Sequence, residues 1–425
     1  MRIASLAWKN LAHRPLGALL SILLLALGTG LIVLLLLLNK QLEEQFERNL
    51  QGIDLVVGAK GSPLQLLLSS VYHVDAPTGN IPVKEAAPYL KENHPIISRA
   101  VPLALGDSYA GYRIVGTTAA FRELYELEVA DGNWWTHSSE VVVGRQAASR
   151  LDLSPGDVIY SAHGVTSDTN LTHKDHPLKV VGILQPSGTV ADQLLLTNVA
   201  TVWETHSTHG DHSEHAHHGD EDHGHKHEHL PTTAAEEAAW IVERQDEELT
   251  SLLFSFRAQN FQSLSMPRAI NEYTSMMAAN PVFEVSRLRS LLGTGTDALR
   301  YLALVIMIVS GLSVFIALYS SLRERRSELA LMRTMGAGPW KLFAVLMSEG
   351  LLLAFAGAVL GLLLGHLAMI FLSASLEGGY GYAFTAMRFL PGELIVLAGA
   401  VGLGFLAALF PALQARRTDI AEALR

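Results

Sequence analysis

The sequence predicts an α-helical membrane protein with four transmembrane helices and a large extracytoplasmic α+β domain inserted between the first and second. The 425 residues are 49% hydrophobic and only 17% charged, which leaves too little charged surface for a water-soluble protein of this size. Four apolar stretches are long enough to cross a bilayer as helices. Residues 41–298 hold 17 Lys and Arg against 34 Asp and Glu, whereas the rest of the chain holds 14 against 7. Such a charge asymmetry indicates two different environments and makes a nucleic-acid partner unlikely for the acidic segment.

The first apolar stretch is the 23-residue run 16–38, which follows a basic segment. A cleaved signal peptide is the rival interpretation, but its hydrophobic region would be shorter and no small-residue cleavage site follows, so we expect a retained helix. The expected organisation is a cytoplasmic amphipathic helix (1–15), the first span (16–38), the extracytoplasmic domain (39–299), the second span (300–322), a cytoplasmic loop (323–342), the third span (343–372), a short external loop (373–393), the fourth span (394–413) and a cytoplasmic tail (414–425).

Basic residues set the expected orientation, because short cytoplasmic segments carry an excess of Lys and Arg. They gather in the N-terminal segment, in the loop between the second and third spans, and in the tail: Arg2, Lys9, Arg14, Arg323, Arg325, Arg326, Arg333, Lys341, Arg416, Arg417 and Arg425. The loop between the third and fourth spans has only Arg388. Both termini are therefore expected in the cytoplasm and the acidic domain outside it, in the periplasm of a Gram-negative organism.

The inserted segment mixes helical and strand patterns. Strands are expected at 53–57, 112–115, 140–143, 158–160 and 179–184, a polar helix at 41–51 that continues the first span, a helix running into a strand over 234–255, and helices at 267–280 and 286–292. The order of these elements is too irregular for a parallel nucleotide-binding sheet, and no GxGxxG follows a strand.

Residues 206–229 form a His-rich segment that holds 10 of the 18 histidines of the chain: His206, His209, His212, His215, His217, His218, His223, His225, His227 and His229. Imidazoles interleaved with carboxylates suit zinc, nickel or copper(II), and the chain has no Cys for a thiolate site. A solvated low-complexity insert that meets metal only incidentally is the plainer alternative. Sensing of pH is a third, because imidazoles titrate near neutrality.

The third span carries a ladder of small residues, Gly357, Gly361 and Gly365, at the spacing that lets two helices approach closely. His366 is the one ionisable side chain deep in this span, and we weigh a hydrogen-bonded packing role against a functional one. No chain of acidic residues crosses the four spans, so a proton- or sodium-driven transport path is not supported.

The loop between the second and third spans predicts a short basic helix that ends at Gly336 in a C-cap position. A membrane anchor without a partner would explain its charge alone. Its pattern, however, is Arg325-x-x-Glu328-x-Ala330-x-x-Arg333-x-x-Gly336-Ala337 followed by Glu349, and this resembles the signature of the FtsX/MacB family of ABC-transporter permeases. Further similarities to that family are Leu6-Ala7-Trp8-Lys9-Asn10-Leu11 at the start, Glu140-Val-Val-Val-Gly144 with Leu153-Ser-Pro-Gly-Asp157 in the insert, and Pro411-Ala412-x-x-Ala415-Arg416 in the tail.

The resemblance implies a permease that forms a homodimer in the bacterial inner membrane, among membrane lipids, and docks on a cytoplasmic ABC ATPase. In that case Arg325, Glu328, Arg333, Gly336 and Glu349 shape or contact the ATPase joint, and ATP with Mg²⁺ binds on the partner, because these 425 residues contain no GxxxxGK[ST] loop. No catalytic residue is expected in the chain itself. The His-rich segment departs from the family pattern.

We therefore expect an ABC-transporter permease that converts ATP hydrolysis by a separate subunit into movement of its external domain. That movement would serve export or periplasmic handling of a substrate, with a link to zinc or another divalent metal and a periplasmic adaptor or metal-binding partner. Two alternatives stay open: extraction of lipid-linked cargo, as in lipoprotein-releasing complexes, and a membrane-anchored metal sensor or scaffold without transport.

Overall fold

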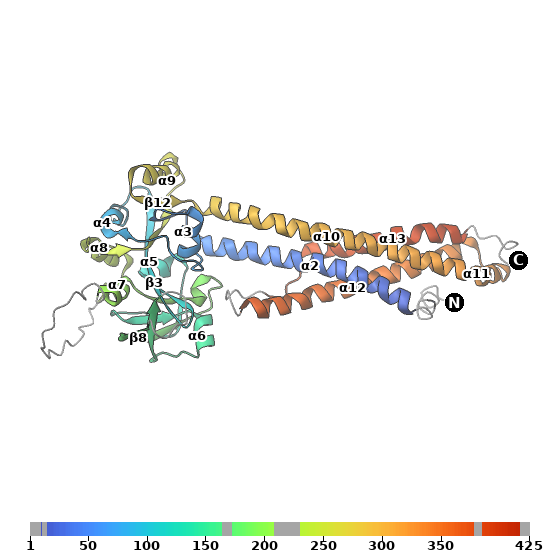
Figure 1. Cartoon of the computed structure of the whole chain (residues 1–425), viewed down its shortest axis with the longest axis horizontal. Helices are drawn as coiled ribbons and strands as arrows, with labels where there is room; N and C mark the ends of the chain where they lie inside the picture. The colour runs from blue at the N-terminus through green and yellow to red at the C-terminus, as the bar shows by residue number, and fades with distance from the viewer. Residues whose placement is uncertain (1–9, 11–14, 164–171, 208–229, 378–384, 417–425) are drawn as a thin grey trace. The chain divides into compact units, whose positions relative to one another are not determined.

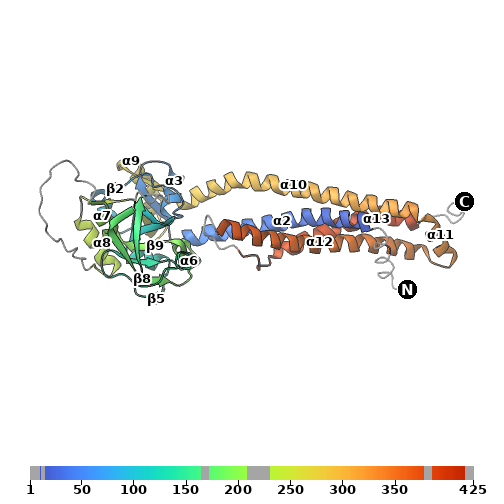
Figure 2. The same cartoon turned by 60° about the horizontal axis from the view of Figure 1, so that its bottom comes forward.

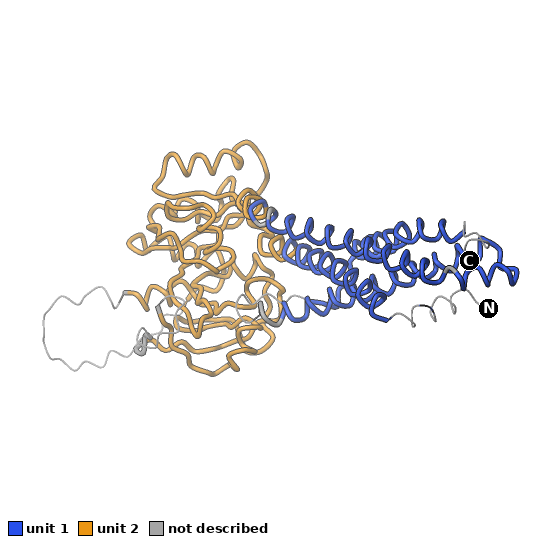
Figure 3. The backbone as a smooth tube through the Cα atoms, turned by 45° about the vertical axis from the view of Figure 1, so that its right-hand side comes forward, with its two compact units in different colours: residues 1–43, 290–425 blue, residues 44–289 orange. Residues whose placement is uncertain are grey.

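The computed structural model describes residues 10, 15–163, 172–207, 230–377 and 385–416. The chain divides into two compact units, which Figure 3 colours blue and orange. We call residues 1–43 and 290–425 the helical unit, and residues 44–289 the inserted domain.

Among the described residues, four helices are long and apolar enough to cross a membrane, and most of each belongs to the helical unit. They are α2 (Pro15–Leu50), α10 (Pro281–Glu324), α12 (Pro339–Glu377) and α13 (Pro391–Arg416), and the short helix α11 (Arg326–Thr334) lies between α10 and α12. Within the helical unit they run lengthwise beside one another, with α11 at one end (Figures 1 and 2). The polar helix expected after the first span is confirmed, because α2 continues without a break to Leu50.

Small residues let the long helices approach one another closely. A Cβ atom built on Gly357 would lie 2.9 Å from Cβ of Leu25, and one on Gly361 would lie 2.6 Å from Cβ of Thr29, both on α2. Gly365 meets Val33 of α2 at 2.8 Å in the same way. The glycine ladder of α12 therefore faces α2 of the same chain, where a larger side chain would push the two backbones apart.

A mixed β-sheet of ten strands forms the inserted domain. Its strands are β1 (Leu55–Ala59), β3 (Ile97–Tyr109), β4 (Tyr112–Thr117), β5 (Val129–Gly132), β6 (Glu140–Val143), β7 (Val158–His163), β8 (Thr172–Leu184), β9 (Leu195–Asn198), β11 (Ser251–Phe256) and β12 (Met276–Ala279). The order is β12-β1-β11-β3-β4-β9-β6-β8-β5, with β7 paired to β3 and β8, and a separate pair joins β2 (Ile81–Pro82) to β10 (Glu248–Leu249). Of the strand pairs in the described part of the chain, only β4 with β9 and β6 with β8 are parallel, so these strands do not form a nucleotide-binding parallel sheet.

Helices cover both faces of this sheet. They are α3 (Pro63–Ser70), α4 (Val83–Ala86), α5 (Ala119–Leu124), α6 (Arg145–Leu151), α7 (Val199–Ser207), α8 (Ala234–Glu243) and α9 (Phe261–Tyr273). Side chains of a strand alternate between its two faces, so Val56 packs with α3 and α5, whereas its neighbours Leu55 and Val57 pack with α4, α7, α8 and α9. The described residues of the domain thus form apolar clusters on both sides of the sheet, and a third cluster packs α6 against β4, β6, β7, β8 and β9.

The helix predicted over 267–280 is wrong in its second half. Helix α9 begins earlier, after the capping residue Asn260, and ends at Tyr273. Residues 276–279 form strand β12, whose Ala279 pairs with Val56 of β1. Met and Ala favour helices, but here burial and a backbone ladder with β1 outweigh that preference.

Candidate functional site

The chain turns sharply at both ends of α11. Arg325 interrupts the helical backbone between α10 and α11, with φ −101° and ψ 17°. At the other end Gly336 has φ +92°, a conformation that glycine adopts far more readily than other residues, and the N–H of Ala337 donates to the carbonyl of Met332 at 2.9 Å. These two turns bring α11 against the start of α12. We call the stretch from Arg325 to Glu349 the α11 corner.

Arg325 is the centre of a polar network in this corner. Its Nε donates to Oε2 of Glu328 at 2.8 Å, and its Nη2 donates to Oδ1 of Asn10 at 2.8 Å. Its Nη1 lies 3.6 Å from Oε1 of Glu349. Nδ2 of Asn10 closes the ring by donating to the same Oε1 of Glu349 at 2.6 Å. One guanidinium therefore ties the N-terminal segment, α11 and α12 together.

The two carboxylates of the network differ in their surroundings. The Glu349 side chain is only 3% exposed and lies beside buried Leu342 and Leu346, whereas the Glu328 side chain is 61% exposed. A buried carboxylate is costly without compensating partners, and Arg325 and Asn10 supply them. Glu349 anchors the network, while Glu328 faces outward, where another protein can reach it.

Large apolar side chains are exposed along the stretch of chain that follows Glu328. Leu331 and Met335 lie at the end of α11 and Trp340 at the start of α12, with 52%, 79% and 61% of their surfaces exposed. The guanidinium of Arg416 lies 4.3 Å from the centre of the Trp340 ring. We call Glu328, Leu331, Met335 and Trp340 the α11 face. An exposed apolar patch next to charges is typical of protein–protein contact sites.

The structure brings together only some of the residues expected at the ATPase joint. Arg325, Glu328 and Glu349 contact one another through Arg325, whereas Arg333 and Gly336 lie at the other end of α11. Sequence reasoning missed Asn10 as a member of the network. Its position in the N-terminal motif was the available signal, but the contact to Glu349 spans 339 positions of the chain.

Of the His-rich segment, the structure describes only the first histidine. His206 is at the end of α7, and its Nε2 lies 3.7 Å from Oδ1 of the buried Asp107. It lines a cavity of about 550 Å³ together with Trp203, Asp246 and Glu247. The other predicted ligands lie outside the described residues: His209, His212, His215, His217, His218, His223, His225, His227 and His229. Within the part of the chain that is described, no three His, Asp or Glu side chains gather as metal ligands.

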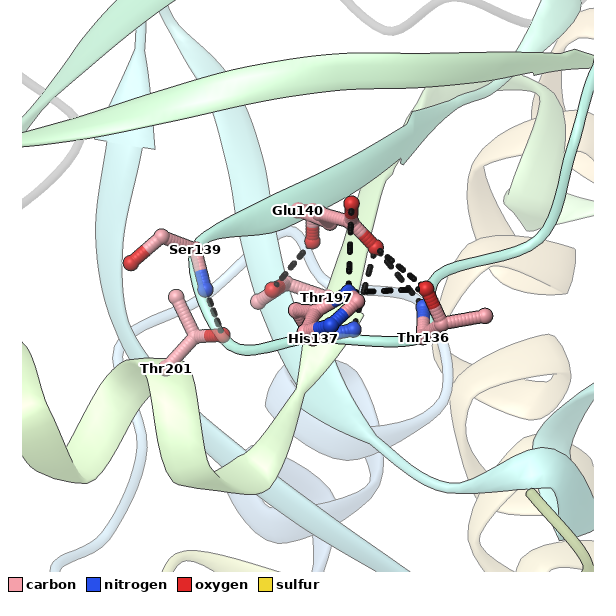
Figure 4. A network of polar contacts seen from close by, with 6 residues as sticks. All are labelled: Thr136, His137, Ser139, Glu140, Thr197 and Thr201. Carbon is pink, nitrogen blue, oxygen red and sulfur yellow. Dashed lines mark hydrogen bonds and ion pairs between the residues drawn. The ribbon is translucent and has the colours of Figure 1, made fainter. Parts of the chain in front are cut away.

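A polar network around Glu140 includes Thr136, His137, Ser139 and Thr201 (Figure 4). Oε2 of Glu140 accepts the N–H groups of Thr136 and His137 at 2.7 and 3.1 Å. The N–H of Ser139 donates to Oγ1 of Thr201 on α7, at 3.0 Å. The carbonyl of Thr136 in turn accepts the N–H of Leu230, the first described residue after 208–229, at 3.1 Å. The entry and exit of the His-rich segment are thus tied to one turn of the domain.

Two family descriptions match the chain in succession. The MacB-like periplasmic core domain matches residues 18–220, and the FtsX-like permease C-terminal domain matches residues 301–420, which include the α11 corner from Arg325 to Glu349.

Among curated relatives, the macrolide export ATP-binding/permease protein MacB of Pasteurella multocida is 23% identical over 97% of this chain and 58% of its own length. MacB of Shewanella oneidensis is 22% identical over 79% of this chain and 47% of its own length. The ABC transporter permease YtrF of Bacillus subtilis is 23% identical over 36% of this chain and 35% of its own.

Among solved structures, the periplasmic region of MacB from Actinobacillus actinomycetemcomitans matches 57% of this chain and 96% of its own, with a TM-score of 0.32 and 9% identity. The chain spans about half the length of the curated MacB relatives it matches. With a MacB-type domain inserted after the first of four membrane-type helices, and an FtsX-type region over the last three, the chain belongs to the FtsX/MacB family of ABC-transporter permeases.

Proposed function

We propose that this chain is a permease subunit that receives movement at the α11 corner from a cytoplasmic ABC ATPase and transmits it to the inserted domain. The observation that carries the proposal is the Arg325 network, which joins the N-terminal segment, α11 and α12 beside an exposed apolar face. The ion pairs and hydrogen bonds of this network would transmit a displacement of α11 to α12, which a flexible loop would not do. Charge-assisted bonds are directional, which suits a contact that must move as a unit.

Reversing the charge of Glu328 tests this role. In Glu328→Arg the new guanidinium faces that of Arg325, and the α11 face loses its negative charge. We expect stimulation of the ATPase by the permease to fall about tenfold, a size that is usual for the coupling between two sites. Stability should change by less than about 1 kcal/mol, because the Glu328 side chain is 61% exposed. The measurement is ATP hydrolysis by the ATPase with the purified permease reconstituted in lipid.

Glu272→Arg is the matched control. Glu272 pairs with Arg268 at 2.7 Å on the exposed surface of α9, so the same charge change is made far from α11 in the sequence. The control should leave ATPase stimulation unchanged. Full stimulation with Glu328→Arg would contradict the coupling role, and equal loss in both variants would show a general charge effect instead.

The proposed arrangement is a homodimer in the bacterial inner membrane, with both termini and α11 in the cytoplasm and the inserted domain in the periplasm. The basic loop and tail and the acidic inserted domain support this orientation. The names of the MacB relatives combine ATP binding with permease function, and this supports an ATPase partner for a chain without a phosphate-binding loop. Because the relatives are only 22–23% identical, their macrolide substrate is not carried over.

We further propose that the function of this permease is linked to a divalent metal. It is supported by the histidines of residues 206–229 and by the acidic cavity at His206. Deleting residues 208–229 tests it and keeps His206, which packs on Gly106 and lies near Asp107. Growth altered under zinc starvation or zinc excess would support a metal-linked function. Unaltered growth under both would favour substrate handling without metal, including extraction of lipid-linked cargo.

A further inference from the structure

The cavity at His206 lies within the inserted domain, between β3, α7 and residues 246–250, and we call it the α7 cavity. Its volume of about 550 Å³ is within the range of small-molecule binding sites. Apolar and aromatic side chains form part of its wall, among them Leu105 of β3 and Val202 and Trp203 of α7. The α7 cavity therefore has the size and the lining of a ligand site.

Hydrogen bonds and ring stacking hold this wall in place. Nε1 of Trp203 donates to the carbonyl oxygen of Glu248 at 2.7 Å, and the Trp203 ring stacks on that of Trp240, with 5.7 Å between the ring centres. Nδ2 of Asn80 donates to Oε2 of Glu248 at 3.1 Å, and Oδ1 of Asn80 accepts from Oγ1 of Thr250 at 3.3 Å. A wall that is ordered before binding lowers the entropic cost of holding a ligand.

The charge of the wall has one sign. Asp246, Glu247 and Glu248 line the α7 cavity, and no Lys or Arg is among the described residues that do so. Glu248 is bound by Asn80, whereas neither Asp246 nor Glu247 forms an ion pair with another residue in the described part of the chain. Two carboxylates without a compensating cation attract positively charged ligands and repel anions.

Another cavity of the inserted domain shows that this charge is not a general property of its hollows. That cavity has a volume of about 350 Å³, and its wall carries Lys91 and Arg99 as well as Glu92 and Glu123. Nε of Arg99 lies 3.6 Å from Oε2 of Glu123. Its charges therefore balance, which those of the α7 cavity do not.

The spread of the carboxylates favours an organic cation over a bare metal ion. A divalent metal needs several donor atoms that converge at about 2.0–2.6 Å from the ion. The α7 cavity attracts metal ions by its charge, but no three His, Asp or Glu side chains gather in this way within the described residues. An ammonium group needs only one or two carboxylates, and an apolar body attached to it can lie against an aromatic wall.

We propose that the α7 cavity binds a small organic cation, whose ammonium group pairs with Asp246 and Glu247 and whose apolar body packs on Trp203 and Leu105. This site goes beyond the coupling role of the α11 corner and does not rest on it, because binding to the inserted domain needs no ATPase. A chain that failed to stimulate an ATPase would still bind the cation.

Tryptamine is a suitable probe, because it carries a protonated amine on an aromatic body. Equilibrium dialysis of radiolabelled tryptamine against the full chain in detergent micelles measures its binding, and empty micelles measure its partition into detergent. We expect saturable binding at pH 7. Tryptophol, which has a hydroxyl group in place of the amine, should compete at least about tenfold more weakly, because it forms no charge-assisted bond. Absence of saturable binding, or equal competition by tryptophol, would overturn the proposal.

A double substitution assigns the binding to the α7 cavity. Asp246→Asn with Glu247→Gln removes both charges and keeps the shape of the side chains, one of which is exposed and the other half-buried. The affinity for tryptamine should fall at least about tenfold. Glu92→Gln with Glu123→Gln makes the same charge change at the 350 Å³ cavity and should leave the affinity unchanged.

Unchanged affinity in the Asp246 and Glu247 variant would refute the site. Equal loss in both variants would refute it too, because the net charge of the domain would then explain the binding. The thermal unfolding midpoint shows whether the variants fold. If the variant of the α7 cavity does not fold, the comparison of tryptamine with tryptophol on the wild-type chain decides between the two results.

Discussion

Glu237 is a buried carboxyl group of the inserted domain, with only 2% of its surface exposed. It lies on α8 and accepts hydrogen bonds from the N–H of Ala119 at 2.5 Å and from Nδ2 of Asn198 at 2.9 Å. Burial raises its pKa from the usual 4.5 to about 7, although the hydrogen bonds from Ala119, Trp135 and Asn198 act in the opposite direction. Glu237 therefore keeps a proton in the folded chain at pH values where it has lost it in the unfolded chain.

This raised pKa makes stability depend on pH. Between pH 4.5 and about 7 the folded state holds one more proton than the unfolded state, so the free energy of unfolding should fall as the pH rises, by on the order of 3 kcal/mol. In Glu237→Gln this fall should be absent. Thermal unfolding of the full chain at several pH values checks it, with Glu236→Gln, an exposed neighbour on α8, as the control. Equal pH dependence in wild type and Glu237→Gln would contradict the assignment.

At the scale of residues, short spacing along one helix could be predicted from the sequence, and contacts between distant segments could not. Arg325 and Glu328, both in the family pattern, are three positions apart, and such spacing brings two side chains close enough to pair, as these two do. No role was predicted for Asn10 or Glu393. Asn10 contacts Glu349, and Glu393 contacts His366, only once the helices have packed.

At the scale of elements, close packing of α12 on α2 depends on glycine. A Cβ at Gly361 would lie 2.7 Å from the backbone oxygen of Ala26, an atom that cannot move aside as a side chain can. Gly361→Ala should therefore destabilise the helical unit by about 1–3 kcal/mol. Gly402→Ala on α13 is the control, because a Cβ there meets nothing within 4 Å and alanine favours the helix. Thermal unfolding in detergent should show a lowered midpoint for Gly361→Ala alone; equal midpoints would mean that the helices have room to separate.

The long helices could be predicted because their signal is local. An apolar run of about 20 residues identifies a span without knowledge of its neighbours, and α2, α10, α12 and α13 each contain one. The strands of the sheet were harder to predict from the sequence. The 13-residue strand β3 was not predicted, and β12 was taken for helix, because both are defined by their pairing with other strands, which residue preferences along the chain do not reveal.

At the scale of the whole molecule, the order of parts could be predicted from hydropathy and charge: one span, a large acidic insert and three further spans. The division into a helical unit and an inserted domain agrees with that order. The family resemblance followed from residue patterns at the start of the chain, in the insert, in the loop after the second span and in the tail. The network at Arg325 needed the structure, because it joins three segments.

The central claim is that the α11 face is the cytoplasmic docking site of an ATPase. A cysteine placed at Met335, which is 79% exposed on this face of a chain without Cys, provides one attachment point for a photo-crosslinker. The account predicts that light captures an ATP hydrolase with a phosphate-binding loop, and that a membrane-impermeant maleimide added to intact cells leaves the cysteine unlabelled. Labelling from outside the cell, or capture of no ATP hydrolase at all, would contradict the account.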